Sequence, residues 1–194
     1  SKLRSEAHLE AAAGPAQAVR EPYEPPTLSV NRQNPPFQGG PGTGPGHEEG
    51  AWRVVEPTTE SLWEGSLELR WRVLRAPWGQ SRGSECDELE HVSHQRVVIT
   101  AGGVVVGTGR LHRVDAMTGQ IRYMAVDPAW EGRGVGRALV EALEAEARLQ
   151  GLRTMILEAR EPVMGFYQRL GYRVSHPGKV LFGAIPHVWM TKEL

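Results

Sequence analysis

The sequence predicts an α/β (α+β) protein in which a mixed, mostly antiparallel sheet is flanked by helices. Two observations predict this fold class. From residue 51 onward, short apolar segments recur between turns rich in Gly, Pro, Asp and Ser, as is typical of strands. After residues 132–136, apolar residues recur at three- and four-residue spacing, as is typical of an amphipathic helix.

Taken in order, the segments read β-α-β-β-β-α-β-α-β-β. A strand at 52–55 precedes a helix capped by Thr59 or Ser61, since Ser61 to Glu64 has the form of a capping box. The long helix ends near Gln150, because the next residue is a glycine. The remaining elements are strands at 97–100, 104–111, 120–126, 154–158, 172–175 and 188–191, and a short helix at 162–170.

Residues 1–50 differ in composition from the rest, with eight prolines and seven glycines. Such a stretch has too few apolar side chains to form a core, so we expect a disordered N-terminal extension (1–50) before one folded domain (51–194). The alternative is a segment that docks on a partner or a second copy through Tyr23, Leu28 and Phe37.

Composition argues against several classes of protein. The net charge is −1, so no basic field suggests nucleic acid, and no run of about 18 apolar residues suggests a membrane span. The single cysteine, Cys86, excludes an internal disulfide framework and fits a cytoplasmic protein. His91 and His94 have helical ligand spacing without an obvious third ligand, so we expect no metal. A homodimer stays possible.

The most informative stretch is a glycine turn between a strand and the long helix. Gly132, Gly134 and Gly136 alternate with other residues, and Arg133 and Arg137 lie among them. A helix N-terminus has free N–H groups and a partial positive charge, which suits a phosphate or pyrophosphate. The spacing fits neither a Walker A loop nor the G-x-G-x-x-G dinucleotide fingerprint.

Five motifs carry a resemblance to a known family. They are Val105–Leu111, Ile121–Pro128, Gly132–Leu139, Gly165–Tyr172 and Ile185–Lys192. In this order they resemble the GNAT superfamily of N-acetyltransferases, and the last is also similar to its ElaA-like branch. The resemblance covers residues 51–194 and implies the GNAT acyl-CoA N-acyltransferase fold. It implies an enzyme that transfers acetyl from acetyl-CoA to a primary amine, of a small molecule or peptide, by direct attack in a ternary complex.

The resemblance also implies roles for individual residues. Tyr167 matches the position that protonates the departing sulfur of CoA, and the strand ending at Val126 would carry a bulge. Arg160 stands where the superfamily often has an asparagine that holds the cofactor. The residues expected to bind acetyl-CoA are Met124, Ala125, Val126, Gly132, Arg133, Gly134, Val135, Gly136, Arg137 and Arg160. Two departures are Glu131, which we expect to be exposed, and Gly183, which replaces an acidic residue.

The base that deprotonates the amine is open between Glu158, at a strand end, and His187, since histidine changes protonation near neutral pH. The alternative interpretations are a solvated carboxylate and a histidine bonded within the sheet; for Tyr167 the alternative is a packed aromatic. Two other functions compete with acetyl transfer. One is a catalytically silent acyl-CoA-binding sensor, and the other is a nucleotide-phosphate module, which the failed phosphate-loop tests disfavour.

Overall fold

The computed structural model describes residues 51–194, so the predictions for residues 1–50 lie outside the described part. The strands are β1 (Trp52–Val55), β2 (His94–Thr100), β3 (Val105–Arg113), β4 (Thr118–Val126), β5 (Thr154–Arg160), β6 (Arg173–Leu181) and β7 (Ile185–Glu193). The helices are α1 (Glu60–Leu74), α2 (Val135–Leu149) and α3 (Met164–Arg169).

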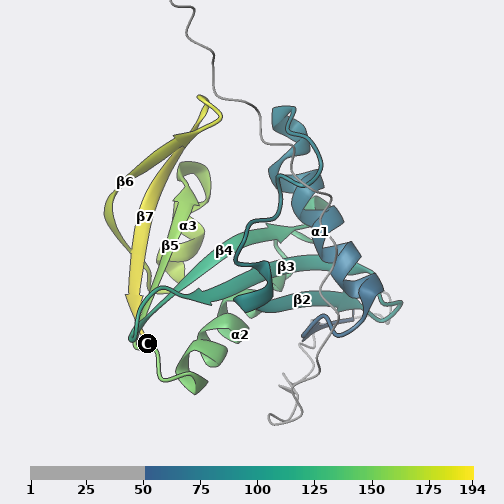
Figure 1. Cartoon of the computed structure of the whole chain (residues 1–194), viewed down its shortest axis with the longest axis horizontal. Helices are drawn as coiled ribbons and strands as arrows, with labels where there is room; N and C mark the ends of the chain where they lie inside the picture. The colour runs from purple at the N-terminus through teal and green to yellow at the C-terminus, as the bar shows by residue number, and fades with distance from the viewer. Residues whose placement is uncertain (1–50) are drawn as a thin grey trace, which may run out of the picture.

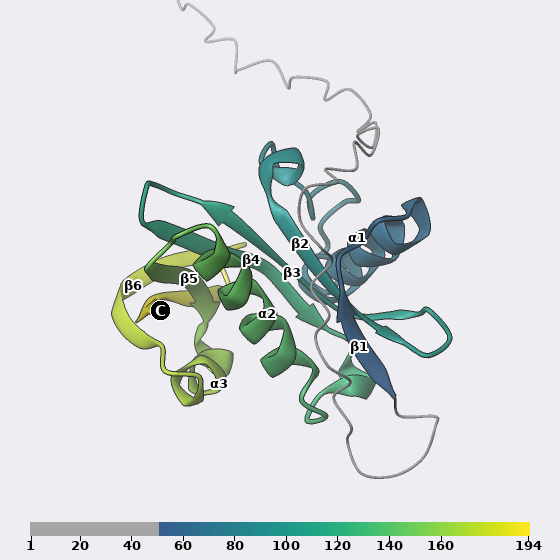
Figure 2. The ribbon, with the colours of Figure 1, turned by 90° about the horizontal axis from the view of Figure 1, so that it is seen from below.

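The seven strands form one sheet in the order β1-β2-β3-β4-β5-β7-β6, and only the β4–β5 pair is parallel. The mixed, mostly antiparallel sheet predicted from the sequence is therefore confirmed. Helix α1 covers one face of the sheet, and α2 and α3 cover the other (Figure 2). We call these the α1 face and the α2 face.

The core lies on the α2 face. Leu139, Leu143 and Ala147 of α2 are buried against β3, β4 and β5. Gly107 of β3 allows this close contact, because a Cβ there would lie 2.7 Å from a side-chain carbon of Val135. Because this apolar stripe is buried, the three- and four-residue spacing of apolar residues in the sequence predicted α2 correctly.

Several element boundaries differ from the sequence prediction. Strand β2 begins at His94 rather than residue 97, and β6 and β7 form a hairpin of nine residues each. Most of β6 is exposed, so it lacks the alternating apolar pattern that marks a half-buried strand. Of the two predicted caps of α1, Thr59 is the one observed, since its hydroxyl accepts a hydrogen bond from the Leu62 amide at 3.3 Å.

The sheet opens between β4 and β5. The two strands pair only over Thr118–Ile121 and Thr154–Leu157. Beyond these residues they diverge, as Figure 1 shows above the corner where they meet. Backbone groups of β4 after Ile121 therefore face this gap without a partner strand among residues 51–194.

A bulge in β4 lies beside the gap. Thr108 pairs with Ala125 and Arg110 with Arg122, so β4 has one extra residue between the pairs. Tyr123 is this extra residue, and its backbone has a left-handed conformation with φ 52°. Because of the bulge, both Arg122 and Tyr123 lie toward the α1 face, while Met124 joins the core on the α2 face.

Candidate active site

A cavity of about 850 Å³ occupies the gap between β4 and β5. Its wall includes the bulged part of β4, the start of α2, the end of β5, and parts of α3 and β7. Twelve of the predicted site residues line it: Met124, Ala125, Val126, Gly132, Gly134, Val135, Gly136, Arg137, Glu158, Arg160, Tyr167 and His187. The thirteenth, Arg133, does not.

The cavity reaches both faces of the sheet, and strand alternation assigns its residues to two halves. Leu157 and Ala159 of β5 pack with Tyr167 in the core on the α2 face. Glu158 and Arg160 alternate with them and therefore point to the α1 face. The directly opposite residues of β7, Trp189 and His187, share that face.

The start of α2 forms one end of the half on the α2 face. Gly134 is the N-cap with φ 82°, a conformation that favours glycine, and the first helical hydrogen bond runs from the Ala138 amide to the Gly134 carbonyl at 3.0 Å. The amides before Ala138 therefore have no partner within the helix. Val135 is buried, whereas Gly134 and Arg137 are exposed on the cavity wall. This arrangement suits an anionic group.

The charged side chains around this turn differ from the prediction in part. The guanidinium of Arg133 lies over the ring of Trp130, 5.1 Å from its centroid, and outside the cavity wall. Arg137 lines the cavity but also pairs with Glu141 at 2.8 Å. Glu131 is exposed, as the sequence predicted. Arg169 of α3 also lines the cavity, and sequence reasoning missed it because a surface arginine has no local signal.

Tyr167 lies where α3 meets the cavity and is only 7% exposed. Its ring packs edge-on against Phe166 and Tyr172, with centroids 4.9 and 5.8 Å away. Burial raises the pKa of the phenol well above its ordinary value, because desolvation disfavours the phenolate. The hydroxyl therefore stays protonated and is available as a hydrogen-bond donor.

Glu158 and His187 lie in the half on the α1 face. Glu158 accepts a hydrogen bond from the Lys179 amide at 2.9 Å and faces the Lys179 ammonium at 3.5 Å. The Nδ1 atom of His187 lies 2.8 Å from the Ile185 carbonyl oxygen, which only accepts hydrogen bonds. Nδ1 therefore carries a proton, and in the neutral ring Nε2 is the atom that can take another.

The guanidinium of Arg160 lies on the α1 face of the cavity. Its guanidinium donates to the carbonyl of Leu74, at the end of α1, at 3.4 Å. It thus bridges β5 and α1 on the α1 face, across the sheet from the helical packing around Tyr167. The sequence could not reveal this, because the direction of a side chain at a strand end depends on the neighbouring helix.

A buried ionic network supports the α1 face beside the cavity. Arg70 and Arg110 are fully buried and both pair with Glu90, which is buried as well. Asp87 accepts hydrogen bonds from both terminal nitrogens of Arg110 at 2.6 and 2.8 Å and pairs with Arg122 at 3.0 Å. Burial alone would raise the pKa of Asp87, but Arg110 outweighs it and lowers the pKa to about 2.

Tyr123 joins this network to the cavity. Its hydroxyl donates to Asp87 at 3.3 Å, and four guanidiniums lie within 5.5 Å of its ring centroid. They belong to Arg70, Arg75, Arg110 and Arg122. Cation–π contacts of this kind fix the ring, and the bulge then points it at the cavity. The sequence alone does not reveal this network, because only tertiary packing assembles it.

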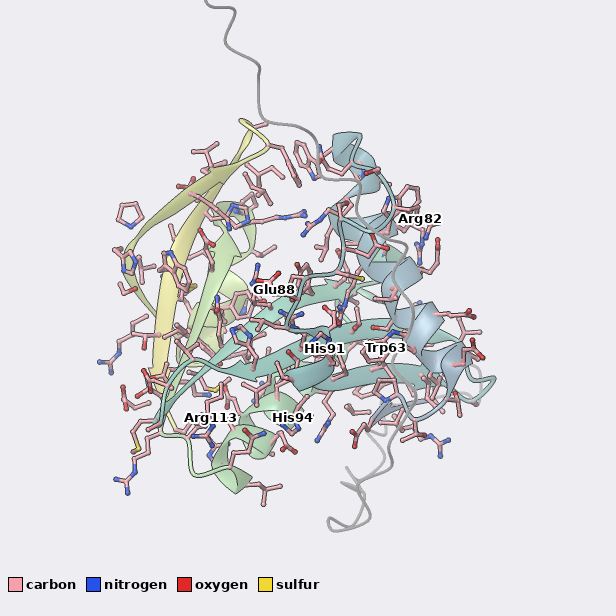
Figure 3. All side chains as sticks on the ribbon, in the orientation of Figure 1. Trp63, Arg82, Glu88, His91, His94 and Arg113 are labelled. Atoms are coloured by element: carbon pink, nitrogen blue, oxygen red, sulfur yellow. The ribbon has the colours of Figure 1, made fainter. Side chains whose placement is uncertain are left out.

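Other residues singled out in the sequence lie outside the cavity wall. His91 and His94 belong to a short 3-10 helix and to β2 rather than to one helix (Figure 3), and His94 faces Glu146 at 3.3 Å. No group of three metal-ligating side chains occurs within residues 51–194.

Burial first, and then Glu90 and Glu85, raise the pKa of Cys86 to about 11, which leaves its thiol unreactive. None of the helices between residues 51 and 194 has the length and apolar character to span a membrane.

Comparison with known proteins decides the family. The model of the acetyltransferase (GNAT) family matches residues 63–172. The chain belongs to the GNAT acetyltransferase family. A Bacillus subtilis (strain 168) protein, named as a candidate acetyltransferase, is 32% identical over 142 residues, which are 72% of this chain and 95% of the relative. The family resemblance inferred from the sequence is therefore confirmed, and the GNAT protein is an acetyl-CoA-dependent acyltransferase.

Solved structures show the same GNAT fold. Escherichia coli ElaA has a TM-score of 0.61 at 19% identity, with 73% of this chain and 98% of ElaA covered. An aminoglycoside 6'-N-acetyltransferase complexed with coenzyme A has a TM-score of 0.61 at 18% identity, with 73% and 96% covered. At these identities the likeness concerns the fold alone.

Proposed function

We propose that this GNAT protein transfers acetyl from acetyl-CoA to a primary amine, with the two substrates entering the cavity from opposite faces of the sheet. One observation carries the proposal. The free amides of the α2 N-terminus and the unpaired edge of β4 flank one half of the cavity, while His187 and Glu158 line the other half.

The residues of the α2 half fit coenzyme A. Gly134, the exposed N-cap of α2, gives an anion close access to backbone N–H groups, as the diphosphate of CoA would need. Arg137 and Arg169, which also line the cavity, add positive charge. Among residues 51–194, the backbone of Met124 to Val126 has no partner strand on the side of the gap, so an amide-bearing arm can pair with it. The CoA complex of the aminoglycoside acetyltransferase with this fold supports the assignment.

Arg133 is the exception among the predicted cofactor residues. Its guanidinium lies over the Trp130 ring, outside the cavity wall, so the proposal includes no direct contact between Arg133 and phosphate. Arg160 likewise belongs to the acceptor half, because its guanidinium is bonded to the end of α1.

The chemistry that this chain would supply has three parts. His187 takes a proton from the ammonium form of the acceptor at Nε2, since Nδ1 is held by the Ile185 carbonyl. The neutral amine nitrogen then attacks the thioester carbon, so that a C–N bond forms and the C–S bond breaks. The proton that the acylated nitrogen loses converts the departing thiolate to the CoA thiol. The Tyr167 hydroxyl donates a hydrogen bond to the sulfur as negative charge develops there, and Glu158 helps to orient the amine.

A direct test supplies acetyl-CoA and a panel of primary amines to the protein and measures the release of free CoA thiol together with acetylated amine by mass spectrometry. We expect stoichiometric thiol and N-acetyl product. Binding of acetyl-CoA with no product from any amine would contradict acetyl transfer and favour the acyl-CoA-binding sensor.

A further inference from the structure

The half of the cavity on the α1 face has an excess of positive charge. Four cationic side chains line it: Arg75, Arg122, Arg160 and Lys179. Lys179 faces Glu158 at 3.5 Å, and Arg122 pairs with Asp87 at 3.0 Å. Within residues 51–194, neither Arg75 nor Arg160 has a carboxylate within ion-pair distance. Two positive charges therefore stand without compensation.

Arg75 and Arg160 lie close together although they are far apart in the chain. Both donate to the carbonyl oxygen of Leu74, Arg75 from one terminal nitrogen at 3.1 Å and Arg160 at 3.4 Å. The Nε of Arg75 also donates to the Ser84 carbonyl at 2.8 Å. These bonds to neutral carbonyls hold the two guanidiniums in place without neutralising them.

The surroundings raise the cost of this excess charge. Both side chains are half-buried, and burial and then Arg75 lower the pKa of Arg160 below its ordinary value. The rings of Tyr123 and Phe182 both lie near Arg75, with centroids 5.5 and 5.7 Å from its guanidinium carbon. Guanidiniums that are fixed, partly desolvated and uncompensated bind planar carboxylates and phosphates well.

The geometry points to an acceptor amine that carries a carboxylate or phosphate, bound by Arg75 and Arg160 while its nitrogen faces the thioester. This inference rests on the proposed acetyl transfer and narrows its substrate class. Within residues 51–194, each guanidinium keeps N–H groups outside these hydrogen bonds, since Arg75 uses Nε and one terminal nitrogen and Arg160 uses one. A simple cationic polyamine would instead meet repulsion in this half.

The test uses two pairs of amines that differ only in the anionic group. Phosphoethanolamine is compared with ethanolamine, and β-alanine with β-alaninamide. Each is assayed for thiol release with the full chain and acetyl-CoA. A charge-assisted contact should favour at least one anionic amine over its neutral partner by about tenfold or more in kcat/KM. The two pairs distinguish phosphate from carboxylate.

Variants connect the preference to the arginine pair. Arg160→Gln should reduce the anionic-to-neutral ratio of kcat/KM about tenfold or more. Arg113→Gln is the matched control, because Arg113 (labelled in Figure 3) also donates to backbone carbonyls, of Ala116 and Gln150, but does not line the cavity. The control should keep the ratio of the wild type.

Several outcomes would overturn the inference. One is neutral amines that react as fast as their anionic partners, which leaves acetyl transfer standing. Another is an Arg160→Gln variant that raises the KM for acetyl-CoA and keeps the amine ratio, because Arg160 would then serve the cofactor.

If CoA binds but no amine is acetylated, the proposed catalysis fails. Calorimetry of the same amine pairs in the presence of CoA then decides the inference. Tighter binding of the anionic amine supports it, and equal or absent binding contradicts it.

Discussion

At Tyr167, burial determines what the hydroxyl can do. The phenol is almost fully buried, and desolvation raises its pKa above an ordinary value that already exceeds that of a thiol. Complete proton donation to a thiolate is therefore uphill, whereas a hydrogen bond that strengthens as the C–S bond breaks is favourable. The contribution of the residue should thus appear in turnover and not in binding.

Tyr167→Phe should lower kcat by about 10²-fold, near the lower limit for general acids, with the KM for acetyl-CoA changed only a few fold. Steady-state assays of thiol release measure both values. Tyr172→Phe is the matched control, because Tyr172 packs against Tyr167 but does not line the cavity. Equal turnover of Tyr167→Phe and wild type would show that the Tyr167 hydroxyl has no role in the reaction.

The two candidate bases differ in the hydrogen-bond and ion-pair partners that they already have. Glu158 is engaged by the amide and ammonium of Lys179, whereas Nε2 of His187 is the open position of a ring anchored through Nδ1. His187→Gln should therefore lower kcat by about 10²-fold or more, and Glu158→Gln by less. His94→Gln, outside the cavity, serves as the control. A larger loss in Glu158→Gln would transfer the role of base to Glu158.

At the scale of elements, the ionic network fixes the segment before β2 to α1, β3 and β4. Asp87 and Glu90 come from this segment, and their partners Arg70, Arg110 and Arg122 come from those elements. Removing one member of such a network leaves buried charges unpaired, which costs about 3–5 kcal/mol. The network therefore stabilises the wall that carries Tyr123.

The network makes stability depend on pH through Asp87. Its folded pKa of about 2 is below the ordinary value of about 3.9. Its stabilising contribution is therefore fully present above pH ~4 and is lost as the pH falls toward 2. The difference in unfolding free energy between wild type and Asp87→Asn should shrink over this window in urea titrations. Glu88→Gln, at the exposed neighbouring residue, should show no such trend, and a constant difference for Asp87→Asn would contradict the assignment.

Elements also differ in how well the sequence predicted them. The apolar period of α2 and the glycines at its start have local causes, so their positions were predicted. The exposed strand β6 has no apolar alternation, so only its start was predicted and its continuation beyond Ser175 to Leu181 was missed. The bulge at Tyr123 followed from the family resemblance, since a left-handed tyrosine has no signal in its own sequence.

For the whole molecule, the two halves of the cavity differ in origin. The α2 half comes mainly from two local motifs, residues 124–137 and 165–172, which is why most of its residues could be named in advance. The α1 half combines the end of α1, the bulge, and the ends of β5 and β7. Arg75 became a candidate only in the structure, because nothing in the sequence brings residue 75 next to residue 160.

The central claim is that the start of α2 binds CoA, and calorimetry with CoA tests it most directly. Gly134→Ala places a Cβ at φ 82°, which strains the cap by about 1–2 kcal/mol and displaces the free amides. Gly103→Ala carries the same strain at φ 80° in the turn between β2 and β3, away from the cavity. We expect CoA to bind wild type and Gly103→Ala equally, and Gly134→Ala about tenfold or more weakly. Equal affinity of all three proteins, or no heat of binding with wild type, would contradict the account.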